Sequence, residues 1–229
     1  MEKNLRILST DNTPFQDRFE AGRLLADELK EYEGKKAAVL GIPRGGVVIA
    51  REIAHRIKGD LDLVLAHKLG APGNPELAVG AVVEGGKIFL DPAVESALGI
   101  GEDYIRQESR NQFEVIKTRS GQYRHILEKT PLKNRIVIIT DDGAARGLTM
   151  QAALWAARAE KPKKLICALP VAPVSAVGVM AKYADEVICL RCPEEFYALG
   201  QFYLDFQQVE DEDILNMLSA EANQRRKAG

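Results

Sequence analysis

Residues 135 to 150 read RIVIITDDGAARGLTM, an apolar run that ends at two adjacent aspartates and continues into a loop of small residues. The run is rich in isoleucine and valine and does not alternate with polar residues. That pattern is typical of a strand covered on both faces in a parallel sheet. Small residues let the backbone turn tightly with its amides directed inward. The stretch therefore predicts a strand, an acidic turn and then a helix.

The same succession of short apolar runs and helical stretches extends over the 229 residues. It predicts an α/β fold, with a mostly parallel open sheet flanked by helices. We expect strands at 37–42, 61–66, 77–83, 135–140, 164–170 and 186–190, and helices at 15–32, 46–57, 149–159 and 174–183. Ligands of such sheets bind beyond the carboxyl ends of the strands, so four loops matter most. They are 43–46, 67–76, 141–149 and 170–173.

We interpret residues 1–229 as a single domain with a core at about 14–192. Residues 92–128 interrupt the alternation and are long, charged and helical in pattern, with a loop expected at 119–125. Such a region is an insertion or a mobile flap. Residues 193–229 are dense in aromatics and end in an amphipathic stretch, so we expect a small hood and a C-terminal helix there.

Composition limits the class of protein. With 46% hydrophobic and 28% charged residues and a net charge of -2, the chain has the profile of a soluble globular protein. The charge gives no reason to expect nucleic acid or an anionic membrane as a partner. The absence of a long apolar stretch and of a leader, together with only three cysteines, predicts a cytoplasmic protein. Cys189 and Cys192 form a C-x-x-C pair, which we interpret as strand-end cysteines rather than a zinc or redox site.

The loop after the apolar run has two chemical elements. Its amides and the following helix N-terminus form a site for a phosphate. Asp141 and Asp142 would repel a phosphate, but they accept hydrogen bonds from sugar hydroxyls and can hold a divalent metal through water. A ribose 5-phosphate has this layout. The alternative is that the two acids are ordinary turn and cap residues.

The loop at 43–46 reads PRGG, in which Gly45 and Gly46 allow an unusual backbone and Arg44 offers a forked donor to phosphate oxygens. It is neither a Walker loop nor a dinucleotide fingerprint, and a plain glycine turn with a solvated arginine is the alternative. Lys68 stands where a strand ends, so its ammonium can reach a ligand at the sheet edge. His67 is interpreted as structural. No serine elbow or Cys–His pairing indicates covalent hydrolysis.

Residues 135–150 resemble the signature of the type I phosphoribosyltransferases: four apolar residues, two acids, three small or apolar residues, then Thr-Gly-x-Thr. The match covers the acid pair, Gly147 and Thr149. Further segments resemble a bacterial subgroup of that family in the same order across nearly the whole chain. They are 15–26, PRGG, KLGAPGNPELAVGA at 68–81, ALPVAP at 168–173, and 194–206.

The resemblance implies a Mg²⁺-dependent enzyme that moves ribose 5-phosphate from phosphoribosyl pyrophosphate (PRPP) to an acceptor, expected to be a nitrogenous base, and releases pyrophosphate. It implies that Asp141 and Asp142 bind the ribose hydroxyls and that Lys68 assists the departing pyrophosphate, which makes these three the catalytic candidates. The 5-phosphate would be held by Gly143, Ala144, Ala145, Arg146, Gly147, Leu148 and Thr149. The pyrophosphate would be held by Arg44, Gly45, Gly46 and Lys68, often with a cis peptide bond in that loop.

The resemblance also implies roles outside these loops. Tyr123 and Arg124 would belong to a flap that closes over the site. Val171, Phe202 and Tyr203 would contact the acceptor. Mg²⁺ would bind mainly through the substrate, with water-mediated contact to the acid pair, and homodimers are common in the family.

Two positions depart from the family pattern. Arg146 stands where the first threonine is usual, which removes one hydroxyl and adds a guanidinium. Ala145 stands where 6-oxopurine enzymes carry an aspartate, so hypoxanthine and guanine are less expected as acceptors. A non-catalytic sensor of PRPP or of a nucleotide with the same fold remains an alternative. A phosphorylation receiver is disfavoured, because its acids normally follow the first strand and no glycine loop comes after them.

Overall fold

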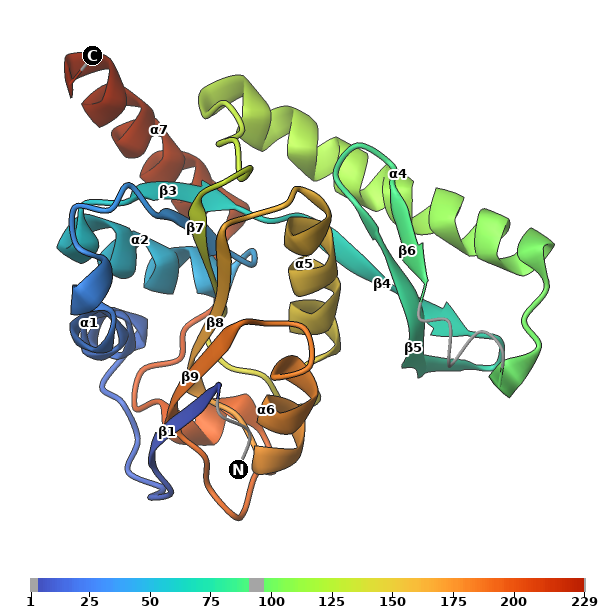
Figure 1. The fold of residues 1–229 in the computed structure, drawn as a ribbon, viewed down its shortest axis with the longest axis horizontal. Helices are drawn as coiled ribbons and strands as arrows, with labels where there is room; N and C mark the ends of the chain where they lie inside the picture. Colours follow the sequence, from blue (N-terminus) through green and yellow to red (C-terminus); the bar gives the residue numbers. More distant parts are fainter. Residues whose placement is uncertain (1–3, 91–96, 229) are drawn as a thin grey trace.

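The computed structural model describes residues 4–90 and 97–228. Its centre is a six-stranded sheet in the order β1-β9-β8-β7-β2-β3, in which every neighbouring pair is parallel (Figure 1). The strands are β1 (Leu5–Ser9), β2 (Ala38–Gly41), β3 (Asp60–Leu63), β7 (Ile136–Thr140), β8 (Lys164–Val171) and β9 (Glu186–Arg191). The predicted α/β fold with a mostly parallel sheet is confirmed.

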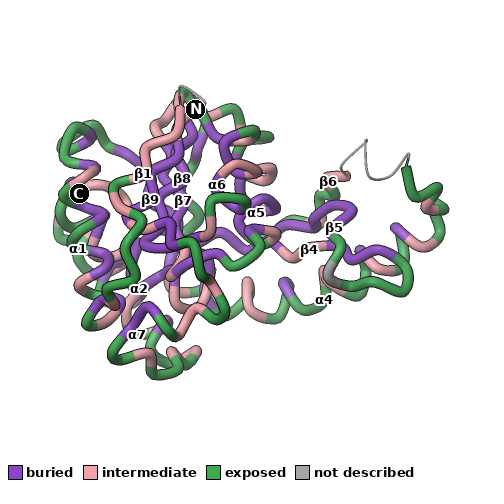
Figure 2. Tube along the Cα trace, turned by 90° about the horizontal axis from the view of Figure 1, so that it is seen from below, coloured by how far each residue is buried: buried purple, intermediate pink, exposed green. Residues whose placement is uncertain are grey.

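Helices cover both faces of this sheet, which explains the uninterrupted apolar runs. One face packs against α1 (Arg18–Glu28) and α2 (Gly45–Ile57), and the other against α5 (Leu148–Ala159) and α6 (Val174–Met180). Along β7, Val137 and Ile139 face the α5 side while Ile138 faces the α1 side. Successive side chains of the strand point to opposite faces of the sheet, and they are buried because helices cover both faces (Figure 2).

A second, antiparallel sheet in the order β4-β5-β6 departs from the prediction. It comprises β4 (Ala66–Ala71), β5 (Asn74–Val83) and β6 (Ile88–Leu90). The run at 77–83 was expected among the other predicted strands of the mostly parallel sheet, but it pairs with β4. Only Pro72 and Gly73 separate β4 from β5, and so short a connection permits a hairpin but no parallel crossover.

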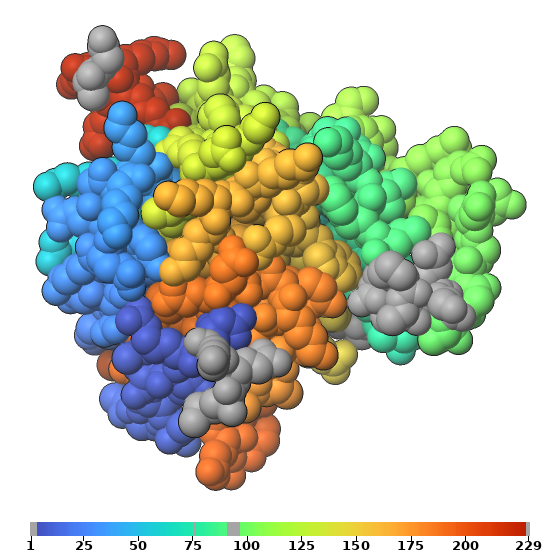
Figure 3. Space-filling model, in the orientation of Figure 1, coloured from blue at the N-terminus to red at the C-terminus, as the bar shows by residue number. Residues whose placement is uncertain are grey.

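This small sheet and α4 (Glu102–Ile126) form an arm that projects from the body (Figures 1 and 3). The loop predicted at 119–125 is wrong, because α4 continues through these residues. Ile116 and Tyr123 lie on one face of the helix and are buried. Packing of that face outweighs the helix-breaking tendency of Ser120 and Gly121.

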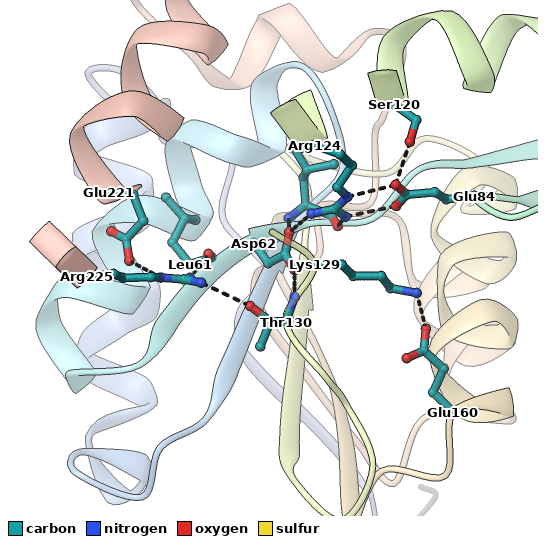
Figure 4. A network of polar contacts seen from close by, with 11 residues as sticks. Leu61, Asp62, Glu84, Ser120, Arg124, Lys129, Thr130, Glu160, Glu221 and Arg225 are labelled. Atoms are coloured by element: carbon teal, nitrogen blue, oxygen red, sulfur yellow. Dashed lines mark hydrogen bonds and ion pairs between the residues drawn. The ribbon is translucent and has the colours of Figure 1, made fainter. Parts of the chain in front are cut away.

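Tyr123 and Arg124 fasten the arm to the body instead of forming a flap loop. Arg124 donates from Nη1 to Asp62 Oδ1 over 2.6 Å and from Nε to Glu84 Oε1 over 2.8 Å (Figure 4). Asp62 is only 1% exposed. Tyr123 is fully buried and donates from its hydroxyl to Asp211. The flap role expected for this pair of residues is therefore corrected.

The tail after β9 returns across α1 and then reaches the arm. It contains η2 (Leu199–Phe202) and α7 (Asp211–Ala228), and a further short helix, η1 (Lys30–Tyr32), follows α1. Phe15 pairs with the tail through backbone bonds to Phe202 and Leu204. α7 contacts both α2 and α4. Within residues 4–90 and 97–228, no helix is both long and apolar enough to cross a bilayer.

Candidate functional site

The loops at 42–44 and 141–147 begin side by side at the carboxyl edge of the sheet. Strands β2 and β7 are neighbours that pair Gly41 with Thr140, and the amide of Ile42 donates to the carbonyl of Thr140 over 3.0 Å. Helices α2 and α5 start directly after these loops. The first amides of a helix lack intrahelical partners, and the helix dipole is positive at that end. Two helix N-termini are therefore directed at one edge of the sheet, where they favour anions.

Two adjoining cavities open between these loops. One, of about 440 Å³, is lined by Lys68, Asp141 and residues 143–150. The other, of about 490 Å³, shares Asp141 and Thr149 with the first and is bounded also by Arg18, Asp142, Phe206 and residues 42–45. The fold thus brings together the predicted ribose, phosphate and pyrophosphate residues, apart from Gly46, which lines neither cavity. They come from two loops and from Lys68, which lies in strand β4 and not in the loop expected at 67–76.

The loop from 143 to 147 lines the first cavity and turns tightly before α5. Gly147 adopts φ +75° immediately before α5, a conformation that favours glycine, and a Cβ there would lie 2.6 Å from Met180 Cε. Arg146 is exposed and lies on the cavity wall. The amide of Ala144, however, donates to the Val171 carbonyl over 3.1 Å. The expectation that the whole backbone from Gly143 onward holds the phosphate is therefore corrected at Ala144.

The paired acids lie in different environments. Oδ1 of Asp141 accepts from the amide of Asp142 over 2.9 Å, and burial together with the charge of Asp142 raises the pKa of Asp141 well above its usual range. Oδ2 of Asp142 accepts from Nε of Arg18 over 2.8 Å, and both side chains are almost buried. One carboxylate is therefore paired with a cation, while the other is costly to ionise.

The second loop has the backbone that the resemblance implies. The peptide bond between Pro43 and Arg44 is cis. Nη1 of Arg44 lies 3.2 Å from Oε2 of Glu210 in the tail. Lys68 projects from β4, and the same cavity that contains the anion loop reaches it. Arg44 thus stands at the start of α2, and Lys68 lines the cavity at the start of α5.

The three predicted acceptor contacts are buried. Val171 and Phe202 are fully buried and Tyr203 is 5% exposed. Phe202 packs against Phe196, with ring centroids 4.9 Å apart, and the Tyr203 hydroxyl donates to the Asp142 carbonyl over 2.6 Å. These rings offer no open face for stacking, so that expectation is corrected. The aromatic ring on the cavity wall is that of Phe206, which is partly exposed.

Sequence reasoning missed Arg18 as well as Phe206. Arg18 is the first residue of α1, and Asp17 caps that helix by accepting from the amide of Glu20 over 2.7 Å. An arginine in an amphipathic helix is normally solvated, so the helical pattern carries no signal for a buried one. The segment FQDRF, which carried part of the resemblance, was the available indication.

The donor atoms of the site fit a magnesium ion shared with substrate phosphates. Among the described residues, no group of three or more His, Cys, Asp or Glu side chains is arranged to hold a metal. Asp141 lines both cavities and Asp142 lines the second, and Mg²⁺ is commonly held by one or two carboxylates plus phosphate oxygens. Cys167, Cys189 and Cys192 are free, buried thiols.

Comparison with known proteins agrees with this geometry. The family model described as phosphoribosyl transferase domain matches residues 16–207. Two Mycobacterium tuberculosis proteins, from strains H37Rv and CDC 1551 and both named "Putative phosphoribosyl transferase", are each 39% identical over 215 residues, or 94% of this chain. The chain spans about half the length of these relatives, 48%.

A crystal structure of TT1426 from Thermus thermophilus has 43% sequence identity to this chain and a TM-score of 0.86. The match covers 91% of this chain and 99% of that one. The family model and the identity of the Mycobacterium tuberculosis relatives show the family of this chain. The chain belongs to the phosphoribosyl transferase domain family.

Proposed function

We propose that the protein transfers ribose 5-phosphate from PRPP to a nitrogenous-base acceptor and releases pyrophosphate. The observation that carries this proposal is the pair of adjoining cavities that share Asp141 and Thr149. Each cavity is bordered by the first residues of a helix, α5 for one and α2 for the other. Two anion sites with carboxylates between them match a ligand that has a phosphate at each end and a diol in the middle.

The role proposed for each group combines that arrangement with the family resemblance. Ala145 to Thr149 bind the 5-phosphate with backbone amides and the Thr149 hydroxyl, and Asp141 and Asp142 accept hydrogen bonds from the ribose hydroxyls. Arg44, Gly45, Gly46 and Lys68 hold the pyrophosphate. Mg²⁺, when bound between the acid pair and the substrate phosphates, supplies positive charge to the leaving group.

The reaction breaks the bond between the anomeric carbon and pyrophosphate and forms a bond from that carbon to an acceptor nitrogen, which loses a proton. Positive charge develops on the sugar while negative charge develops on pyrophosphate. The protein therefore acts by positioning both partners, neutralising the leaving group and keeping water away from the sugar.

Calorimetry with PRPP and Mg²⁺ tests the donor site. We expect saturable binding, and Asp142→Asn should reduce the affinity by about 1–3 kcal/mol because one charge-assisted hydrogen-bond acceptor is lost. Asp103→Asn, at an exposed position on the arm, is the matched control and should bind as the wild type does. No heat of binding at millimolar PRPP would end the proposal.

A sensor of PRPP or of a nucleotide is the second candidate, and Arg146 is the residue that favours it. Its guanidinium stands on the wall of the phosphate cavity at the position of a usual threonine. Pyrophosphate release over a panel of purine and pyrimidine bases separates the two functions. Release with one base supports transfer, whereas tight PRPP binding without release from any base supports the sensor.

A further inference from the structure

Arg18 joins three parts of the molecule at the candidate site. It stands in the first turn of α1, its side chain is 10% exposed, and Nε donates to Oδ2 of Asp142 over 2.8 Å. Nη1 donates to the carbonyl of Gln207 in the tail over 2.8 Å. The guanidinium carbon lies 3.9 Å from the ring centroid of Phe206, which is stacking distance. The guanidinium thus contacts Asp142 through Nε, and it contacts the tail both through Nη1 and by stacking on the Phe206 ring.

Asp142 is held on its backbone as well as on its side chain. The Tyr203 hydroxyl donates to the carbonyl of Asp142 over 2.6 Å, and the Tyr203 ring stacks on Phe206 with centroids 5.0 Å apart. Arg18 bonds to one of the two carboxylate oxygens, and a carboxylate has acceptor capacity for further donors. The contacts therefore fix the direction of the carboxylate and leave it able to accept further hydrogen bonds.

We propose that Arg18 is a positioning residue, which turns the Asp142 carboxylate toward the ribose and transmits the placement of Phe206 and Gln207 to it. The inference rests on the proposed function, because it assigns a sugar hydroxyl to Asp142. It goes further in making the tail part of the donor site: the Phe206 ring on the cavity wall and the Asp142 carboxylate on the ribose side are held by the same guanidinium.

Stability alone does not account for this arrangement. A buried ion pair is weak evidence of stabilisation, because the removal of two charges from water costs about as much as their attraction returns. The guanidinium also divides its donors between Asp142 and Gln207. That division suits a link between two elements better than it suits a maximally strong pair, for which a bidentate bond to the carboxylate is the usual geometry.

Two probes separate positioning from general damage. Ribose 5-phosphate uses both the anion loop and Asp142, whereas inorganic phosphate uses the anion loop alone. By calorimetry, Arg18→Met should weaken ribose 5-phosphate about tenfold, the scale of one charge-assisted hydrogen bond, and leave inorganic phosphate within about twofold. Arg18→Lys, which keeps the charge, should recover about half of the loss on a logarithmic scale. Arg23→Met, on the exposed face of the same helix, is the matched control and should change neither affinity.

A double-mutant cycle tests the link to the tail. Phe206→Leu should weaken ribose 5-phosphate about threefold in the wild type and have no effect in Arg18→Met, because its influence passes through the guanidinium. If Arg18→Met fails to fold by circular dichroism, the same cycle is run with Arg18→Lys. Equal effects of Phe206→Leu in both backgrounds would overturn the link.

The remaining outcomes are also decisive. An unchanged ratio of the two affinities in Arg18→Met, or an equal loss of both without recovery in Arg18→Lys, would leave Arg18 a structural residue and overturn the inference. If the variants give either result while the wild-type protein binds PRPP with Mg²⁺, the inference fails and the proposed function stands. If the wild-type protein binds no PRPP, both the proposed function and the inference about Arg18 are overturned.

Discussion

The carboxylate of Asp142 lies directly against the first residue of α2. A Cβ placed on Gly45 would be 1.9 Å from Oδ2 of Asp142, closer than any real contact allows. The start of α2 and the acid pair therefore occupy fixed positions relative to each other, because glycine is the residue that permits the approach. The ribose side and the pyrophosphate side of the proposed site meet at this contact.

Gly45→Ala should consequently displace the Asp142 carboxylate and weaken PRPP binding by about tenfold or more, since small misplacements of a binding group reduce affinity and rate strongly. The measurement is calorimetry with PRPP and Mg²⁺. Gly178→Ala is the control, because nothing lies within 4 Å of a Cβ at that position in α6. Equal affinities in Gly45→Ala and the wild type would show that Asp142 plays no part in binding.

Asp141→Asn should make the protein more stable at neutral pH. Burial and the charge of Asp142 raise the pKa of Asp141, so the folded state binds this proton more tightly than the unfolded chain does. Stability therefore falls as pH rises from the unfolded pKa toward the raised folded pKa, and stays at the lower level above it. Asparagine carries no charge and avoids that loss.

The difference in melting temperature between Asp141→Asn and the wild type should accordingly be small in acid and grow as pH rises. Thermal unfolding across this pH range measures it, and Asp103→Asn at the exposed start of α4 serves as the control. A melting temperature that drops in Asp141→Asn at neutral pH would contradict the raised pKa. A gain in stability with a loss of PRPP binding is the trade expected of a residue kept for function.

Arg124→Met should lower the free energy of unfolding by about 3–5 kcal/mol, because it leaves the buried carboxylate of Asp62 and the partly buried carboxylate of Glu84 without their guanidinium (Figure 4). Burial alone would raise the pKa of Glu84, and the bonds from Arg124 and Ser120 hold it below its usual value. Urea unfolding gives the change. Arg106→Met on the same helix, where the side chain is 61% exposed, should stay within about 0.5 kcal/mol of the wild type. Similar values for the two variants would mean that the network does not anchor the arm.

Gly121→Ala should stabilise the protein by about 0.5–1 kcal/mol, because Gly121 lies inside α4 and nothing is within 4 Å of a Cβ there. Gly147→Ala should have the opposite sign, since φ is +75° and Met180 Cε is 2.6 Å from the new atom. Urea midpoints of the two variants are compared with that of the wild type. A destabilising Gly121→Ala would indicate that residues 119–125 form the turn that the sequence suggested.

The sequence was sufficient for the central sheet because β2, β7, β8 and β9 are buried on both faces, and burial on both faces leaves an unbroken apolar run. It was insufficient for β1, an edge strand in which Arg6 and Ser9 interrupt the apolar pattern and Leu8 is exposed. An edge strand covered on part of its surface carries too few apolar residues to be distinguished from a loop.

The position of the loops at 42–44 and 141–147 beside each other could be predicted because their residue types are local signals: paired acids, glycines and an arginine directly after apolar runs. The packing of the tail could not. The tail holds Phe196, Phe202, Tyr203 and Phe206 within a short stretch, and periodicity does not tell which ring is buried. Tertiary contacts decide it, since Phe202 pairs with Phe15 through the backbone and Phe206 packs on Arg18 at the cavity.

The tail also limits how far the arm can move. It is attached to the body where the Gln207 carbonyl accepts from Arg18, and to the arm where Asp211 accepts from Tyr123. Four residues of fully extended chain span at most about 14 Å. Together with the Arg124–Asp62 ion pair, this short tether limits the separation between α4 and the acid pair, and a wider swing of the arm must break either the Tyr123–Asp211 or the Arg18–Gln207 hydrogen bond.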